Sequence, residues 1–298
     1  MNLEPECIGC LFNQVLRALK TANPRVSRKI IISTQKKLMD YLLKIDINDI
    51  SAPIVGGFAY NLVAEVLDLT DPYSQLKEKY NQLALTYYDD IKNLVENSED
   101  PLFEAIAAAA LGNTIDFATQ HNIDLINDIK HFSSENFKIN DYNLFKISLE
   151  HVNKNKGHLL ILGDNCGEIV FDKLLVETIK KYHPDLEIIV SVRSIPIIND
   201  ATMEDAKLIG LTDIVKVIEA SPIPGIQLST ATEEFKKYFY DKNGMILSKG
   251  QGNFETLFKT NIPDKDLYYL LKAKCNLMER IFKVKIGSLI FKKKTADF

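Results

Sequence analysis

Three short segments of the sequence carry the side chains with which this protein could do chemistry. They are GDNCGE (163–168), RSIPIINDAT (193–202) and KGQGNFE (249–255). Each one follows a short apolar run that predicts a β-strand. In an open parallel sheet, the segments that follow the strands converge at the carboxyl ends of the strands, where ligands bind. We therefore expect the polar side chains of the three segments to line one site.

The oxygen-bearing side chains of the first two segments indicate a site for a hard divalent cation. Asp164, Asn165 and Asp200 offer carboxylate and amide oxygens. Such ligands suit Mg²⁺ or Mn²⁺, which keep several waters and take further ligands from a phosphate. The five histidines show neither the H-x-H nor the H-E-x-x-H spacing of a histidine metal centre. We interpret the three residues as the metal ligands.

The third segment offers groups that could bind a phosphate. Lys249 precedes a glycine-rich turn at the expected start of a helix, where the Gly250 amide and the Asn253 side chain would meet an anion. In the second segment, Arg193 and Asn199 are candidates for contact with a charged substrate. A cation beside a phosphate-binding turn predicts transfer of a phosphoryl group to water or to another acceptor.

Three side chains are candidates for the catalytic step. A cation on Asp164 would lower the pKa of a bound water, and Lys249 would neutralise the charge that develops on the phosphoryl group. Glu168, one helical turn after Asp164, could orient that water or act as a general base. Direct attack by water and a phosphoenzyme on Asp164 both remain open.

Each of these motifs also has a purely structural interpretation. Asp-Asn-x-Gly and Asn199-Asp200 could be helix caps, and a Lys-Gly turn is usually solvent-exposed. Glu168 could be a first-turn residue that the helix dipole favours, and Arg193 a surface residue at a strand end. Independent caps would not accumulate metal ligands and a phosphate-binding group after three neighbouring strands. Their conjunction therefore favours a phosphoryl-transfer site.

Two further motifs lie outside these segments. Asn113 and Asp116 of GNTIDF (112–117) are three residues apart, so they would share a helix face and could contact the substrate, or Asn113 could be a cap. Cys7-x-x-Cys10 together with Cys275 could form a second, thiolate metal site. A redox pair and unmetallated, reduced thiols are the other two interpretations.

The three segments also resemble the signature blocks of a known family. GDNCGEIVFD (163–172), PIINDATMEDA (196–206) and KGQGNFETL (249–257) resemble those of the metal-dependent damage-control phosphatases, also called acidic-residue-methyltransferase-like domains. The C-x-x-C motif, GNTIDF and AKC (273–275) resemble its mainly prokaryotic branch. The resemblance covers nearly the whole chain. Cys166 is a departure, because alanine is also common at this position, and it would leave an oxidisable thiol near the cation.

The resemblance implies a fold, a cofactor and an activity. The fold would be a helical N-terminal region packed on a Rossmann-like domain. Asp164, Asn165 and Asp200 would hold one divalent cation, Mg²⁺, Mn²⁺, Ni²⁺ or Co²⁺. The enzyme would hydrolyse small phosphate monoesters such as sugar phosphates, phosphopantetheine-like compounds or damaged metabolites. An S-adenosylmethionine-dependent carboxyl methyltransferase and a non-catalytic thiol module are the alternatives, although GDNCGE lacks the glycine-rich turn of a nucleotide-type cofactor site.

The elements that must position these residues change character near residue 154. Before this point, apolar spacing predicts helices over 25–44, 52–69, 72–96 and 101–119, and no strand precedes residue 157. After it, apolar runs alternate with amphipathic segments, which is typical of a parallel sheet flanked by helices. The expected strands are 158–162, 187–192, 213–218, 244–248, 267–272 and a last, edge strand over 286–293. The expected helices are 168–182, 202–210, 229–240, 253–259 and 275–282. We predict a helical domain over 1–153 and a Rossmann-like α/β domain over 154–298 that carries the site.

Composition limits the possible partners. The 298 residues include 36 Lys and Arg against 40 Asp and Glu, a net charge of −4, so no basic excess predicts binding to nucleic acid or anionic lipid. The N-terminus lacks the basic and apolar regions of a targeting signal, and no apolar run is long enough to span a bilayer. We expect a cytoplasmic enzyme that acts on a small phosphorylated metabolite. Composition does not predict its oligomeric state.

Overall fold

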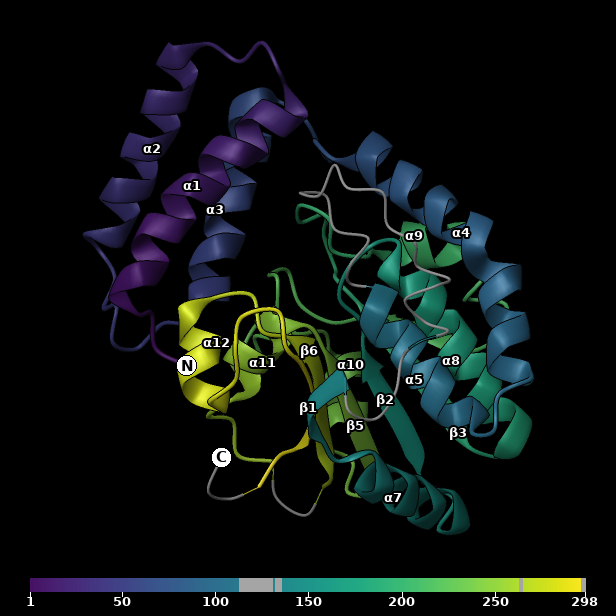
Figure 1. Ribbon diagram of the computed structural model, residues 1–298. Helices are drawn as coiled ribbons and strands as arrows, with labels where there is room; N and C mark the ends of the chain where they lie inside the picture. The colour runs from purple at the N-terminus through teal and green to yellow at the C-terminus, as the bar shows by residue number, and fades with distance from the viewer. Residues whose placement is uncertain (113–130, 132–135, 263–264, 296–298) are drawn as a thin grey trace.

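A seven-stranded sheet lies at the centre of the fold in the computed structural model, which describes residues 1–112, 131, 136–262 and 265–295 (Figure 1). The strands are β1 (Phe137–Asn140), β2 (His158–Leu162), β3 (Glu187–Val192), β4 (Lys216–Glu219), β5 (Gly244–Lys249), β6 (Leu267–Lys272) and β7 (Leu289–Lys293). The described helices are α1 (Pro5–Ala22), α2 (Arg28–Leu42), α3 (Ala52–Leu67), α4 (Ser74–Glu96), α5 (Pro101–Leu111), α7 (Tyr142–Lys154), α8 (Glu168–Tyr182), α9 (Met203–Leu208), α10 (Glu233–Tyr240), α11 (Gln251–Leu257) and α12 (Asn276–Phe282). The predicted α/β fold, with a helical N-terminal region before a mostly parallel sheet, is confirmed.

The order of the strands places the three candidate segments side by side. Across the sheet the order is β1-β7-β6-β5-β2-β3-β4, and only β6 and β7 pair antiparallel. From β2 the chain builds outward through β3 and β4 and then returns to add β5 on the other side of β2. This reversal creates a switch point beside β2, the position at which open α/β sheets bind ligands. The last residue of β2, Leu162, pairs with Ser191 of β3 and Ser248 of β5, so the three segments begin at nearly the same level.

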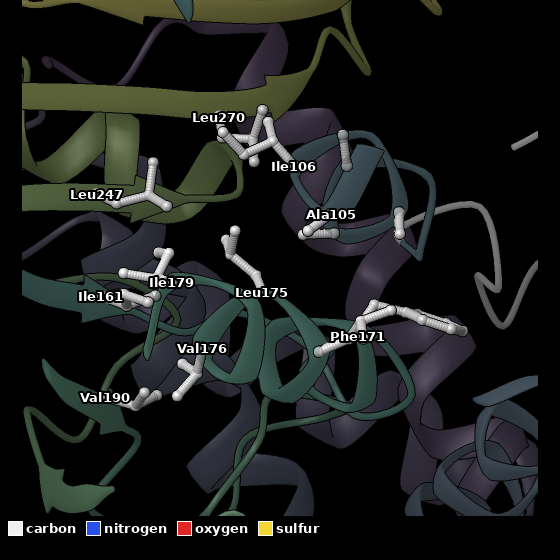
Figure 2. Packing of buried hydrophobic residues seen from close by; sticks show 14 of the residues in the cluster. Ala105, Ile106, Ile161, Phe171, Leu175, Val176, Ile179, Val190, Leu247 and Leu270 are labelled. Carbon is white, nitrogen blue, oxygen red and sulfur yellow. The ribbon is translucent and has the colours of Figure 1, made fainter. Parts of the chain in front are cut away.

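Alternation of side chains along the buried strands divides the core of the sheet into two layers. Leu159 and Ile161 of β2 face α4, α5, α7 and α8, whereas Leu160 and Leu162 face α10, α11 and α12. Figure 2 shows part of the first layer, where side chains of α8 and α5 meet Leu247 and other strand residues. The alanine-rich sequence of α5 allows it to pack closely on α8, because small side chains let the two helices approach.

Helices α1, α2 and α3 form a bundle with its own apolar core. Figure 1 shows this bundle beside the short helices α11 and α12, and α3 contacts α11. Ser27 caps α2 by accepting a hydrogen bond from the Ile30 amide at 3.3 Å. Ile197, from the segment after β3, packs into the core of the bundle. The bundle therefore closes over one side of the candidate site.

Three sequence-based expectations about the strands are wrong. A strand does precede residue 157, since β1 pairs with β7, and β7 therefore lies inside the sheet between β1 and β6. Residues 137–140 have only four positions with alternating burial, so they lack the continuous apolar run by which the other strands are recognised. The strand expected over 213–218 begins only at Lys216, because Asp213, Ile214 and Val215 form a turn after α9.

The expected helices are found with shifted ends, whereas α1 and α7 correspond to no expected segment. The part of the helix expected over 101–119 that follows Gly112 lies outside the described residues. Helix α10 begins at Glu233, where Thr232 caps it by accepting from the Phe235 amide at 3.1 Å, and α11 begins directly after β5. The domain boundary at residues 153 and 154 stays a prediction, and β1 shows that the sheet also uses chain from before it. Among the described residues, no helix is long and apolar enough to cross a bilayer.

Candidate active site

The segments after β2 and β3 are joined through their backbones. The Ala201 amide donates to the carbonyl oxygen of Asp164 at 2.9 Å. Asn165 and Asp200 lie opposite each other in an isolated antiparallel bridge. The structure therefore brings together the three residues that the sequence analysis interprets as metal ligands.

Arg193, the first residue after β3, joins the two carboxylates. Its Nε lies 2.6 Å from Oδ1 of Asp200, and one terminal nitrogen lies 3.4 Å from Oδ1 of Asp164. The other terminal nitrogen donates to the Asn253 side chain at 2.9 Å and to the Gly225 carbonyl at 3.0 Å. The residue is only 2% exposed, and its contact with a substrate stays a prediction. Its guanidinium is turned inward, where it orients the two acids.

Burial shapes the charge of the two aspartates. Burial, together with the carboxylates of Glu168 and Asp200, raises the pKa of Asp164 to about 7 against the opposing charge of Arg193. Burial also raises the pKa of Asp200, although Arg193 opposes this shift. Burial and mutual repulsion disfavour the ionised form of these two neighbouring carboxyl groups. A cation bound beside them would therefore be stabilised by their negative charge.

Gly250 allows the third segment to approach the first. Its φ of 78° lies in the region that favours glycine, and a Cβ at this position would overlap the carboxylate of Asp164. The Gly250 amide donates to the Leu270 carbonyl at 3.0 Å. This amide is thus already paired, and phosphate binding by Gly250 stays a prediction.

The ammonium group of Lys249 points into the protein. Its Nζ lies 2.6 Å from Oε1 of Glu168, contacts Asp172 and donates to the Ala109 carbonyl at 3.0 Å. Side chains alternate along a strand, so this last residue of β5 faces the same layer as Leu247, toward α5 and α8. The side chain is fully buried, and its contact with a phosphoryl group stays a prediction.

Glu168 connects Lys249 with the candidate metal ligands. Asn165 donates through Nδ2 to Oδ2 of Asp164 at 2.9 Å and to Oε2 of Glu168 at 3.4 Å. Both bonds use the amide nitrogen, so the amide oxygen is the Asn165 atom that could ligate a cation. The role of Glu168 as a general base stays a prediction.

The two remaining asparagines of the site differ in their environments. Asn253 is fully buried, and its Nδ2 donates to the carbonyls of Lys249 at 2.7 Å and Gly163 at 3.1 Å. It joins the first and third segments, and phosphate binding by Asn253 stays a prediction. Asn199 is half-buried and accepts at its carbonyl from the Cys166 amide at 2.8 Å. Contact of the Asn199 side chain with a substrate stays a prediction.

Asn113 and Asp116 lie outside the described residues. The residue before them, Gly112, is described at the end of α5, and a Cβ there would meet the Phe171 ring and the backbone of Glu168. The GNTIDF motif therefore begins directly against the start of α8.

The candidate metal ligands open onto a cavity of about 560 Å³. Asp164, Asn165 and Asp200 line it, and α1 and α3 contribute residues such as Cys10 and Tyr60 to its wall. A volume of this order accommodates a small metabolite. The N-terminal bundle thus completes a pocket whose polar end lies at the switch point of the sheet.

Comparison with known proteins assigns the chain to a family. The sequence model of the damage-control phosphatase ARMT1-like domain matches residues 3–290. The chain belongs to this family. It is 33% identical to a damage-control phosphatase of Pyrococcus horikoshii over 97% of each chain, and 30% identical to one of Archaeoglobus fulgidus over 98% of this chain and 99% of that protein. An uncharacterized protein of Methanocaldococcus jannaschii is 35% identical over 99% of this chain and 96% of its own length. The crystal structure of a DUF89 family protein from Pyrococcus horikoshii superposes with a TM-score of 0.85 at 29% identity, covering 99% of this chain and all of that chain.

One functional candidate in this family member escaped the sequence analysis. Lys274 lines the pocket, is exposed, and lowers the pKa of both Asp164 and Asp200. It lies in the AKC motif, between Ala273 and Cys275. The signal was available in that motif, but the strand-end rule led to Lys249, because it says nothing about which face a side chain takes.

The three cysteines of the C-x-x-C and AKC motifs line the same pocket. Burial raises the pKa of Cys7 to about 11 and also raises that of Cys10. Gln14 donates to Sγ of Cys10 and Gln251 to Sγ of Cys275, each at 3.4 Å. In the part of the chain that the structure describes, no three His, Cys, Asp or Glu side chains are arranged to hold a metal. A second, thiolate site therefore stays a prediction, and the first site depends on the amide of Asn165.

Proposed function

We propose that the protein is a divalent-metal-dependent phosphatase that hydrolyses monoesters of small phosphorylated metabolites. Sugar phosphates, phosphopantetheine-like compounds and damaged metabolites are the candidate substrates, and Mg²⁺, Mn²⁺, Ni²⁺ or Co²⁺ the candidate cofactor. The observation that carries the proposal is the pair of buried aspartates, held 2.6 and 3.4 Å from one guanidinium, at the polar end of a metabolite-sized pocket. Membership of a family of damage-control phosphatases supports the same activity.

The donor atoms of the site fit one hard divalent cation. Asp164, Asn165 and Asp200 would hold it, because they offer two carboxylates and an amide oxygen, and the raised pKa values of the acids favour an added positive charge. When bound, such a cation polarises a phosphoryl oxygen and lowers the pKa of a coordinated water.

The protein's own residues would orient and neutralise the reacting groups. Arg193 fixes the two carboxylates, and Lys249 fixes Glu168 next to Asn165. In this proposal Glu168 would accept a proton from an attacking water. Lys274 is the described cation on the pocket wall that could pair with the phosphate of a substrate.

The methyltransferase alternative has weaker support. A dinucleotide or adenosyl cofactor at a switch point is usually approached by a glycine-rich turn, whereas the turn after β2 presents Asp164 and Asn165 to the pocket. Two buried acids disfavour the carboxylate of S-adenosylmethionine, and they favour a cation bound to phosphate.

Hydrolysis of p-nitrophenyl phosphate tests the proposed activity. We expect turnover that EDTA abolishes and that Mg²⁺, Mn²⁺, Ni²⁺ or Co²⁺ restores, followed by turnover of sugar phosphates in a panel of phosphorylated metabolites. Turnover unaffected by EDTA, or micromolar binding of S-adenosylmethionine without phosphatase activity, would reject the proposal.

Metal binding should depend on pH through Asp164. Because the pKa of this residue is raised to about 7, a cation must displace a proton below that pH, and the apparent affinity should rise with pH and then level off above about 7. Calorimetric titration with Mn²⁺ in buffers of different ionisation enthalpy measures the released proton. Equal proton release at pH 6 and pH 8 would contradict this expectation.

Lys274→Met should weaken substrate use without loss of the metal. A charge-assisted contact with phosphate contributes about 1.5–3 kcal/mol, so kcat/KM should fall roughly ten- to hundred-fold while the Kd for Mn²⁺ does not rise. Lys20→Met, which removes an exposed lysine at the far end of α1, is the matched control. Unchanged kcat/KM in Lys274→Met would remove this residue from the site.

A further inference from the structure

A buried asparagine of α4 connects the two turns that carry the candidate metal ligands. Oδ1 of Asn81 accepts from the Gly167 amide at 2.7 Å, and its Nδ2 donates to Oδ1 of Asp205 at 2.9 Å. Asn81 is 0% exposed. Gly167 closes the turn that begins with Asp164, whereas Asp205 follows Asp200 in the segment after β3. One side chain from the helical region therefore spans both turns.

Asp205 transmits this contact to the second turn. Its Oδ2 accepts from the amide and the hydroxyl of Thr202, at 2.9 and 2.6 Å, which forms the cap of α9 two residues after Asp200. Lys77, one turn before Asn81 on α4, lies 2.9 Å from the same Oδ2. Both carboxylate oxygens are thus occupied by donors from α4 and from the cap, and Thr202 itself pairs with Arg193.

The backbone of α4 also packs directly on the first turn. Gly167 has a φ of 76°, and a Cβ at this position would lie 3.3 Å from the carbonyl oxygen of Tyr80. The turn therefore approaches α4 closely enough for the Gly167 amide to reach Asn81. An asparagine suits this position because its amide group donates on one side and accepts on the other. Aspartate would face Asp205 with a like charge, and leucine would leave a buried donor and a buried acceptor unpaired.

We propose that Asn81, assisted by Lys77, is a positioning residue that holds the Asp164–Asn165 turn and the Asp200 turn at the separation that a divalent cation requires. This inference rests on the proposed metal site. Residues that orient metal ligands without touching the metal commonly change its affinity by about ten- to hundred-fold when they are replaced. Helix α4 thus contributes to the site although it supplies no ligand and does not line the described pocket.

Binding of Mn²⁺ alone, followed by electron paramagnetic resonance of the free ion, tests the proposal without any substrate. Asn81→Leu should raise the Kd for Mn²⁺ roughly ten- to hundred-fold, and Lys77→Met should raise it in the same direction. Val95→Ala is the matched control, because Val95 is a fully buried residue of the same helix, about 21 Å further along its axis. It should lower the Tm and leave the Kd unchanged. If Asn81→Leu does not fold, Asn81→Ser, which cannot reach both partners, takes its place.

The outcomes separate this inference from the proposed function. If the unaltered protein does not bind Mn²⁺, or if Asp164→Ala binds it as tightly as the unaltered protein, the proposed metal site fails. If the unaltered protein binds and Asp164→Ala does not, while both the Asn81 and the Lys77 variants keep the original Kd, α4 does not position the ligands. A lower Tm with an unchanged Kd in these variants would assign them a structural role only and would overturn the inference.

Discussion

Asp164→Ala is expected to lower kcat/KM for p-nitrophenyl phosphate by more than about a hundred-fold. Replacing a residue that only orients a metal ligand lowers metal affinity or activity about ten- to hundred-fold, and Asp164 is itself a proposed ligand. The variant should still fold. The pKa of Asp164 is raised in the folded protein, so above pH 7 the ionised carboxylate reduces stability, and its removal should not lower the Tm of the metal-free protein.

Thermal unfolding with and without the cation separates loss of binding from loss of structure. A cation at a concentration of a hundred times its Kd stabilises the unaltered protein by about 2.7 kcal/mol, and this stabilisation should be absent in Asp164→Ala. Asp185→Ala is the control, since it removes an exposed carboxylate at the opposite end of the sheet. A metal-dependent rise in Tm that persists in Asp164→Ala would mean that the cation binds elsewhere.

Arg193→Met should produce the largest loss of stability. The buried guanidinium pairs with Asp164 and Asp200, and removal of one partner from a buried ion cluster costs about 3–5 kcal/mol because the remaining charges lose their compensation. The free energy of unfolding, measured in urea at pH 7.5, should fall by this amount. The loss should be smaller at pH 5, where acids with a raised pKa take up protons.

A bound cation should restore part of this stability, since it would neutralise the same two carboxylates from the pocket side. Arg280→Met is the control, because it breaks an exposed ion pair with Glu6 and should change stability little. A similar loss in both arginine variants, or a loss in Arg193→Met that does not depend on pH, would contradict the assigned role of Arg193.

In the candidate site, the sequence predicted the position of the aspartates better than it predicted the direction of the basic side chains. Asp164 and Asn165 closely follow β2, and Asp200 lies in the segment after β3. Segments that follow neighbouring parallel strands converge at the same edge of the sheet. Alternation along β5 sets the side of the sheet that Lys249 faces, but its long side chain, like that of Arg193, can reach more than one partner. Their direction depends on which acids lie within reach, and the acids in question, Asp172 and Asp200, are fixed only when α8 and the segment after β3 are packed.

By itself, the sequence determined the parts of this protein that depend on local pattern: the amphipathic N-terminal helices, the buried strands with their continuous apolar runs, and the polar turns at the ends of β2, β3 and β5. The tertiary structure alone decided the pairing of β1 with β7, the partners of the Lys249 ammonium group, and the contact of Asn81 with two turns that lie more than eighty residues further along the chain. The local sequence pattern indicates whether a residue is buried, because apolar residues recur with the period of the helix or strand. It does not record which distant group a buried polar atom will meet, because that partner is set by packing between elements.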